Sequence, residues 1–167
     1  MANPSPWERA AHVWLTDATG DLWSATRALG QTDPVLLPRQ IGFLAQQGAE
    51  KAIKAVLAYA RAPEIPDRHD IAMLLARIPA DPVRPWTVGV RYPRVGALTA
   101  MAVQGRYAVL GREVDRAEAA SLTALATGIY RACLHDLVAH GMQVQGLAIP
   151  ALLWRPDPDR CPGGPAR

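Results

Sequence analysis

An arginine and a histidine in the last predicted helix are the best candidates for acid–base chemistry. Arg131 and His135 are separated by Ala-Cys-Leu, so on a helix they lie one turn apart on the same face. An imidazole can transfer a proton near neutral pH, and a guanidinium can hold a phosphate through two hydrogen bonds. The pair could therefore act on a phosphodiester, or it could be a polar patch in solvent or in an interface. Small residues that would let another helix approach share this face: Ala117, Ala120, Ala124, Gly128 and Ala139.

Arginines and aromatic residues are interleaved between residues 77 and 116. Guanidinium groups match phosphates and aromatic rings stack on bases, so this composition is typical of a nucleotide or RNA surface. The alternative is that arginines on long loops are solvated or bind the chain's own carboxylates. As ligand-binding residues we predict Arg91, Arg94, Arg106 and Tyr107; the segment also contains Arg77, Arg84, Arg112, Arg116, Trp86 and Tyr92.

A charged face is predicted on the helix that contains residues 43–57. At 100° per residue, Gln47, Glu50, Lys51 and Lys54 lie opposite the apolar positions. Gln47 and Lys51 are predicted to contribute polar contacts to a ligand. The alternative is a solvent-exposed face, which is the usual environment of charged helix residues.

The remaining histidines form no metal-binding motif. His69 precedes Asp70, whose carboxylate suits the first turn of a helix, so we predict a structural role for this pair. His12 and His140 are isolated, and the chain has no Glu-x-x-His, His-x-x-x-His or paired-cysteine spacing. No metal and no organic cofactor are predicted, because glycine-rich nucleotide motifs are absent as well.

Length and composition fit one helical domain. The chain has 167 residues, of which 50% are hydrophobic, and a formal charge of only +3, which is too small to indicate nucleic acid by itself. Two cysteines cannot form a disulfide framework, and we find neither a signal peptide nor a run of about 18 apolar residues. We therefore expect a cytoplasmic protein that binds no membrane.

Capping residues and apolar periodicity predict an all-α protein, with an up-and-down bundle of four to five helices at residues 1–140. Residues 141–167 form an extension that is first apolar, with residues 147–154 folded back on the bundle, and then Pro/Gly-rich and partly disordered. The predicted helices span residues 6–30, 33–60, 69–77, 96–104 and 115–140, and a loop is predicted over residues 79–93.

Several of these patterns resemble the HEPN family, the small helical domains of prokaryotes and higher eukaryotes named for nucleotide binding. The resemblance covers residues 7–140. It rests on Ala-Gln-Gln-Gly-Ala-Glu-Lys-Ala-Ile-Lys-Ala at residues 45–55, on His69-Asp70, and on Arg106-Tyr107 before the final helix, although the usual proline after that tyrosine is Ala108 here. The resemblance implies a helical bundle that is commonly a homodimer.

For activity, the resemblance implies two alternatives. Catalytic members are metal-independent ribonucleases whose motif is an arginine, four to six intervening residues and a histidine, whereas Arg131 and His135 have only three between them. The leading hypothesis is therefore a homodimeric nucleotide- or RNA-binding module, with a nucleotidyltransferase as a candidate partner. The alternatives are a ribonuclease that uses Arg131 and His135, as in a toxin–antitoxin or defence system, and a bundle that only binds other proteins.

Overall fold

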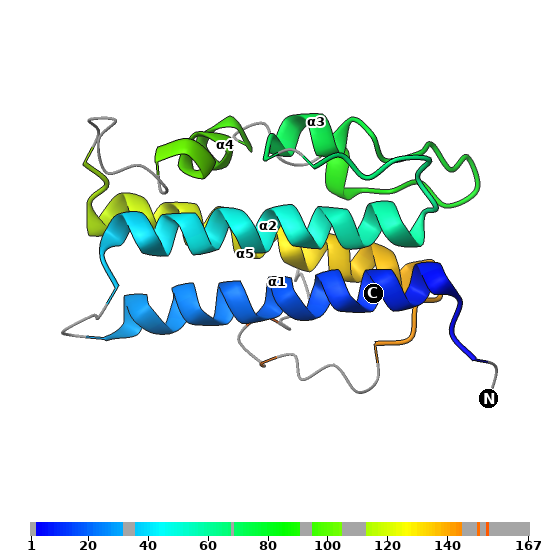
Figure 1. Ribbon diagram of the computed structural model, residues 1–167, viewed down its shortest axis with the longest axis horizontal. Coiled ribbons are helices and arrows are strands. Elements are labelled where there is room, and N and C mark those ends of the chain that lie inside the picture. The colour runs from blue at the N-terminus through cyan, green and yellow to red at the C-terminus, as the bar shows by residue number, and fades with distance from the viewer. Residues whose placement is uncertain are drawn as a thin grey trace, which may run out of the picture.

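The chain folds into a bundle of helices. The computed structural model describes residues 3–31, 36–67, 69–90, 95–104 and 113–144, together with Pro150 and Leu153. Over these residues no strand occurs, which confirms the all-α fold class. The elements are α1 (Pro6–Gly30), α2 (Pro38–Tyr59), α3 (Ile71–Leu75), the 3-10 turn η1 (Val88–Val90), α4 (Val95–Gln104) and α5 (Arg116–Ala139) (Figure 1).

Helix α2 is the centre of this bundle. It packs against α1 and α5, and the short helices α3 and α4 cover another of its sides (Figure 1). As a result, polar as well as apolar positions of α2 are buried. None of the described helices is long and apolar enough to cross a membrane.

The contact between α1 and α2 depends on a glycine. A Cβ atom at Gly48 would lie 2.5 Å from Cγ of Leu22 and 3.2 Å from the carbonyl oxygen of Ala18. Both distances are shorter than ordinary van der Waals contact, so a larger residue would force the helices apart. Other small residues of α2 are fully buried as well: Ala45, Ala49, Ala52, Ala55 and Ala58.

Three helix ends follow the sequence prediction. Ser5 and Glu8 form a capping box, in which the Ser5 hydroxyl accepts from the Glu8 amide at 3.2 Å and a Glu8 carboxylate oxygen accepts from the Ser5 amide at 2.7 Å. The carboxylate of Asp115 accepts a hydrogen bond from the amide of Glu118 at 2.7 Å and begins α5. Gly141 follows α5 with φ of +94°, a conformation that glycine adopts without strain.

Two of the predicted helices have wrong boundaries. Helix α2 begins at Pro38 rather than at residue 33, because proline lacks an amide hydrogen and suits the first helical position but not the second turn. Helix α3 is only Ile71–Leu75. It begins after Asp70, whose carboxylate accepts from the amides of Ala72 and Met73, so His69 lies just outside the helix.

Of the C-terminal extension, the structure describes residues 141–144, Pro150 and Leu153. Leu153 is fully buried and belongs to the hydrophobic core, and its amide donates to the carbonyl of Pro150 at 2.8 Å. Pro150 and Leu153 are the described residues of segment 147–154, and the other residues of this segment, which is predicted to fold back on the bundle, lie outside the described part of the chain. The Pro/Gly-rich residues 156–167 lie outside the described part of the chain.

Candidate functional site

Arg131 and His135 lie one turn apart on the outer side of α5. His135 is exposed and Arg131 is partly buried. The Nε atom of Arg131 donates to the carbonyl oxygen of Leu153 at 3.3 Å, so the C-terminal extension passes beside this side chain. The small residues of the same face lie at the surface: Ala117, Ala120, Ala124 and Ala139 are exposed and Gly128 is half-buried.

The inner side of α5 fixes the position of this face. Tyr130 is fully buried, and its hydroxyl lies 2.7 Å from the hydroxyl of Thr19 on α1. Asp136 is also buried, and its carboxylate accepts from the Thr87 hydroxyl and from the amides of Thr87 and Val88. These contacts are made by residues adjacent to Arg131 and His135. They therefore fix the backbone of α5 at this pair through its inner side.

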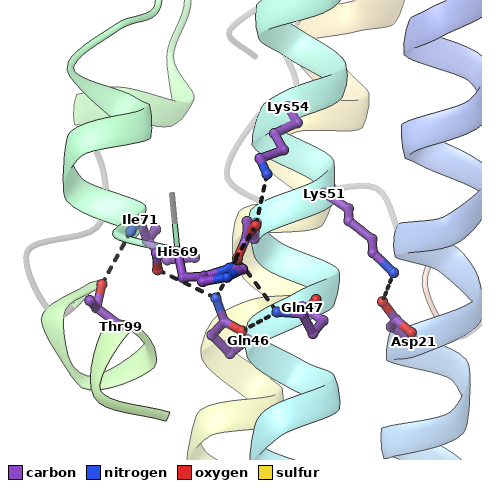
Figure 2. Close-up of polar contacts among 9 residues, drawn as sticks. Asp21, Gln46, Gln47, Lys51, Lys54, His69, Ile71 and Thr99 are labelled. Atoms are coloured by element: carbon purple, nitrogen blue, oxygen red, sulfur yellow. Dashed lines mark hydrogen bonds and ion pairs between the residues drawn. The ribbon is translucent and has the colours of Figure 1, made fainter. Parts of the chain in front are cut away.

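A buried polar network lies in the middle of α2, where the sequence predicted an exposed or ligand-facing surface. Gln46, Glu50 and Lys54 have at most 5% of their surface exposed. Glu50 accepts from Nζ of Lys54 at 2.9 Å, from Nε2 of Gln46 at 2.7 Å and contacts Nδ1 of His69 at 3.0 Å (Figure 2). The solvent-exposed interpretation of Glu50 and Lys54 is therefore wrong. It failed because α3 and His69, which lies two residues before α3, cover this side of α2.

Ionisation of Glu50 is stabilised inside the network. Burial by itself favours the protonated form, but the hydrogen bonds from Lys54, His69 and Gln46 outweigh it, so the pKa of Glu50 lies below its ordinary value. The Lys54 ammonium also lies 5.2 Å from the ring centre of Trp14, which adds a cation–π contact from α1. Each buried charge thus has a partner of its own.

The network joins several helices. His69 reaches Glu50 from the start of α3, and the carbonyl oxygen of His69 lies 3.5 Å from Nε2 of Gln46. The hydroxyl of Thr99 on α4 accepts from the amide of Ile71 at 3.2 Å (Figure 2). The structural role predicted for the His69-Asp70 pair agrees with these contacts. Sequence reasoning did not pair His69 with Glu50, because a separation of 19 residues gives no periodic signal.

Two predicted ligand-binding residues of α2 make contacts within the chain. Nζ of Lys51 forms a salt bridge with Asp21 of α1 at 2.7 Å. Burial raises the pKa of Asp21 despite this lysine. Nε2 of Gln47 donates to Oε1 of Gln46 at 2.6 Å and so extends the buried network. A ligand at these side chains would have to compete with those contacts.

The arginine-rich segment is only partly described. Arg91, Arg94, Arg106 and Tyr107 lie outside the described residues. Two of the arginines that are described bind backbone carbonyls: Arg84 donates to Ala139 at 3.4 Å, and Arg116 donates to Leu29 and, at 2.8 Å, to Gln31. Within the described ranges, no group of three or more histidine, cysteine or acidic side chains is arranged to hold a metal ion.

Comparison with protein families agrees with this architecture. The family model of the HEPN domain matches residues 11–136, from the second turn of α1 to the last turn of α5. The chain belongs to the HEPN domain family. The match includes the buried network, His69 and the Arg131/His135 pair, and membership supports a nucleotide- or RNA-related module. No curated protein and no solved structure matches the chain significantly.

Proposed function

We propose that this HEPN protein is a homodimeric module that binds a nucleotide or RNA, with the phosphate contacts supplied by Arg131 and the arginine-rich segment. The observation that carries the proposal is the outer face of α5, where a guanidinium and an imidazole lie one turn apart beside exposed small residues. Arg91, Arg94, Arg106 and Tyr107 are proposed as further ligand-binding residues. A nucleotidyltransferase is a further proposed partner.

The small residues of this face support the proposed dimer. Ala120, Ala124 and Gly128 carry little or no side chain, so a second helix can approach α5 closely. In a two-fold dimer identical patches meet, and pairing near Gly128 would bring two copies of Arg131 and His135 together. Light scattering should then report about twice the chain mass of 18.0 kDa at micromolar concentration. A monomer at high concentration would refute the dimer and the composite surface.

Binding is proposed ahead of cleavage because of the spacing of the pair. Three intervening residues place His135 about 100° away from the position that the shortest ribonuclease motif would give it. A pair on one face can hold one phosphate together, whereas cleavage requires the imidazole within hydrogen-bond reach of the proton it transfers. The ribonuclease remains the alternative function, and it would use the same two residues.

The test of binding is a titration with fluorescently labelled RNA, and with nucleotides, at two salt concentrations. Arg131→Ala should weaken binding and flatten its salt dependence, because fewer phosphates are neutralised. Arg27→Ala is the matched control, since Arg27 is an exposed arginine near the end of α1 and the substitution removes the same charge from another helix. Equal effects of the two substitutions, or no binding by the unmodified protein at low salt, would refute the proposal.

The ribonuclease alternative is tested with structured and unstructured RNA in the presence of a chelator. We expect no cleavage above that of a buffer control. Cleavage that disappears in both His135→Ala and Arg131→Ala, with unchanged helical content, would replace the binding module with the enzyme. Cleavage that survives both substitutions comes from another site or from a contaminant.

A further inference from the structure

An exposed stripe of residues runs along the outer face of helix α1. Its positions are separated alternately by four and three residues, the spacing that keeps side chains on the side of a helix that packs against a second helix. Helix α1 packs on α2 and α5 by its other side and lies at the edge of the described bundle (Figure 1). The six positions of this α1 stripe are all exposed: Arg9, Val13, Thr16, Gly20, Trp23 and Arg27.

Two large apolar side chains of the α1 stripe face the solvent. Val13 is 61% exposed and Trp23 is 40% exposed. Tryptophan has a large apolar surface, and its removal from water is one of the largest single contributions to binding at protein interfaces. The stripe therefore carries a residue that can anchor a contact.

Gly20 is the second unusual feature of this stripe. Glycine in the interior of a helix is less favourable than alanine, so its presence there calls for a packing reason. Gly48 has such a reason, because its Cβ would lie 2.5 Å from Cγ of Leu22, whereas a Cβ at Gly20 would meet no described atom within 4 Å. Trp23 lies one turn away from Gly20 on the same face. The stripe thus presents a large side chain beside a position that has none.

A second copy of α1 fits this face when the two helices run antiparallel. About a two-fold axis, Trp23 of each copy then lies over Gly20 of the other. In the same register, Thr16 lies opposite Arg27. Asp17 is exposed next to Thr16, so its carboxylate comes near the Arg27 guanidinium of the second copy. The face is therefore complementary to itself in both shape and charge.

Charge and shape also select this register. Shifting the second helix by one heptad places Arg9 opposite Arg27, so that like charges face each other. The opposite shift places Trp23 opposite Arg27 and leaves Val13 beyond the end of the second helix. The register in which Trp23 meets Gly20 avoids both disadvantages.

We propose that the α1 stripe is a two-fold contact between copies of this chain, with Trp23 seated on Gly20 at its centre. This contact is independent of RNA binding and of the proposed α5 dimer, and it joins two such dimers. One helix face covers less area than a standard protein interface, so the contact forms only above the micromolar range. Exposed ion pairs add little affinity, so Asp17 and Arg27 set the orientation while Trp23 supplies most of the binding.

Sedimentation velocity from micromolar to millimolar concentration tests this contact. The mass of the unmodified protein should rise above its micromolar value, and Trp23→Gly should weaken this association by at least about tenfold. Trp7→Gly is the matched control and should have no effect, because Trp7 is 44% exposed on the same helix but lies outside the stripe. The α5 dimer is read at micromolar concentration, where Trp23→Gly should leave the mass unchanged, so failure of either contact is recognised separately.

Exchanging the two central residues tests the register. Gly20→Trp fits the free chain, since a Cβ there meets no described atom within 4 Å, but it brings two indoles together in the contact and should weaken association. Gly20→Trp combined with Trp23→Gly again pairs an indole with a glycine, so association should return, with helical content checked by circular dichroism. Stronger association of Gly20→Trp would indicate unspecific apolar attraction and would overturn the proposal. An exchange variant that does not associate, or an unmodified protein whose mass stays constant up to millimolar concentration, would overturn it as well.

Discussion

Removing the charge of Glu50 should destabilise the fold strongly, because it leaves the buried ammonium of Lys54 without its carboxylate partner. In Glu50→Gln the side chain keeps its size, but it has one acceptor oxygen where the carboxylate has two. Three donors contact this carboxylate: those of Lys54, Gln46 and His69. The Lys54 side chain is 6% exposed, so water cannot replace the lost carboxylate. Breaking a buried pair in this way costs about 3–5 kcal/mol, and we expect a loss of free energy of unfolding of about 3 kcal/mol.

A double substitution tests whether the unpaired Lys54 ammonium causes the loss of stability in Glu50→Gln. Lys54→Met removes the ammonium and keeps an apolar chain beside Trp14, so Glu50→Gln combined with Lys54→Met should be more stable than the sum of the single effects predicts. We expect this coupling to be at least about 1 kcal/mol. Urea unfolding at one fixed protein concentration measures all three variants and the unmodified protein.

The chain also provides a matched control pair. Lys51 and Asp21 form a salt bridge of 2.7 Å, but their side chains are 23% and 20% exposed. Asp21→Asn should cost no more than about 1 kcal/mol, because solvent screens the pair and burial already raises the pKa of Asp21. If Glu50→Gln costs no more than Asp21→Asn, or if the single effects add in the double variant, the buried network does not stabilise the fold as argued.

The pH dependence of the same variants has a defined sign. The pKa of Glu50 is lower in the folded protein than its ordinary value of 4.5, so its ionised form stabilises the fold above that value. This contribution is lost as the pH falls through the pKa of the folded state. The stability difference between the unmodified protein and Glu50→Gln should therefore shrink under acid conditions and remain constant at neutral pH.

Three further predictions concern packing, capping and thiol reactivity. Gly48→Ala should lower the free energy of unfolding by about 1–3 kcal/mol through its clash with Leu22, whereas Gly20→Ala, with no atom within 4 Å of its Cβ, should be neutral or slightly stabilising in the same thermal unfolding experiment. Ser5→Ala should cost about 1 kcal/mol in urea unfolding, because it removes the capping box of α1. Cys133 is fully buried, and burial raises the pKa of its thiol well above the ordinary value, so mass spectrometry should find it unalkylated until the protein is unfolded.

The sequence predicted the parts of the fold that depend on local interactions. The start of α1 at Ser5, the start of α5 at Asp115 and its end at Gly141 are determined by capping residues within one turn, and all three were predicted correctly. The start of α2 was predicted too early, because Asp33-Pro34 and Pro38 both fit a helix start locally. Only the structure shows which of these prolines occupies the first turn.

The burial of α2 could not be predicted from its periodicity. The spacing of apolar residues along a helix identifies a polar face, but it does not show whether another element covers that face. Here His69, which lies 19 residues after Glu50 in the sequence, contacts the Glu50 carboxylate. Glu50 is therefore buried, although periodicity alone places it on the polar face of α2. The same limit applies to His140, which looked isolated in the sequence and is bonded to residues of a loop more than 50 positions away.

The outer side of α5 leaves few positions for a histidine, and this bears on the spacing of the candidate pair. Counting from Arg131, four and five intervening residues lead to Asp136 and Leu137, which are both buried. A histidine at position 136 would also lose the three hydrogen bonds that this carboxylate accepts from Thr87 and Val88. Six intervening residues lead to Val138, which is exposed but cannot exchange a proton. His135 is therefore the imidazole that α5 presents beside Arg131, and under the proposed function this pair holds one phosphate rather than dividing acid and base roles across it.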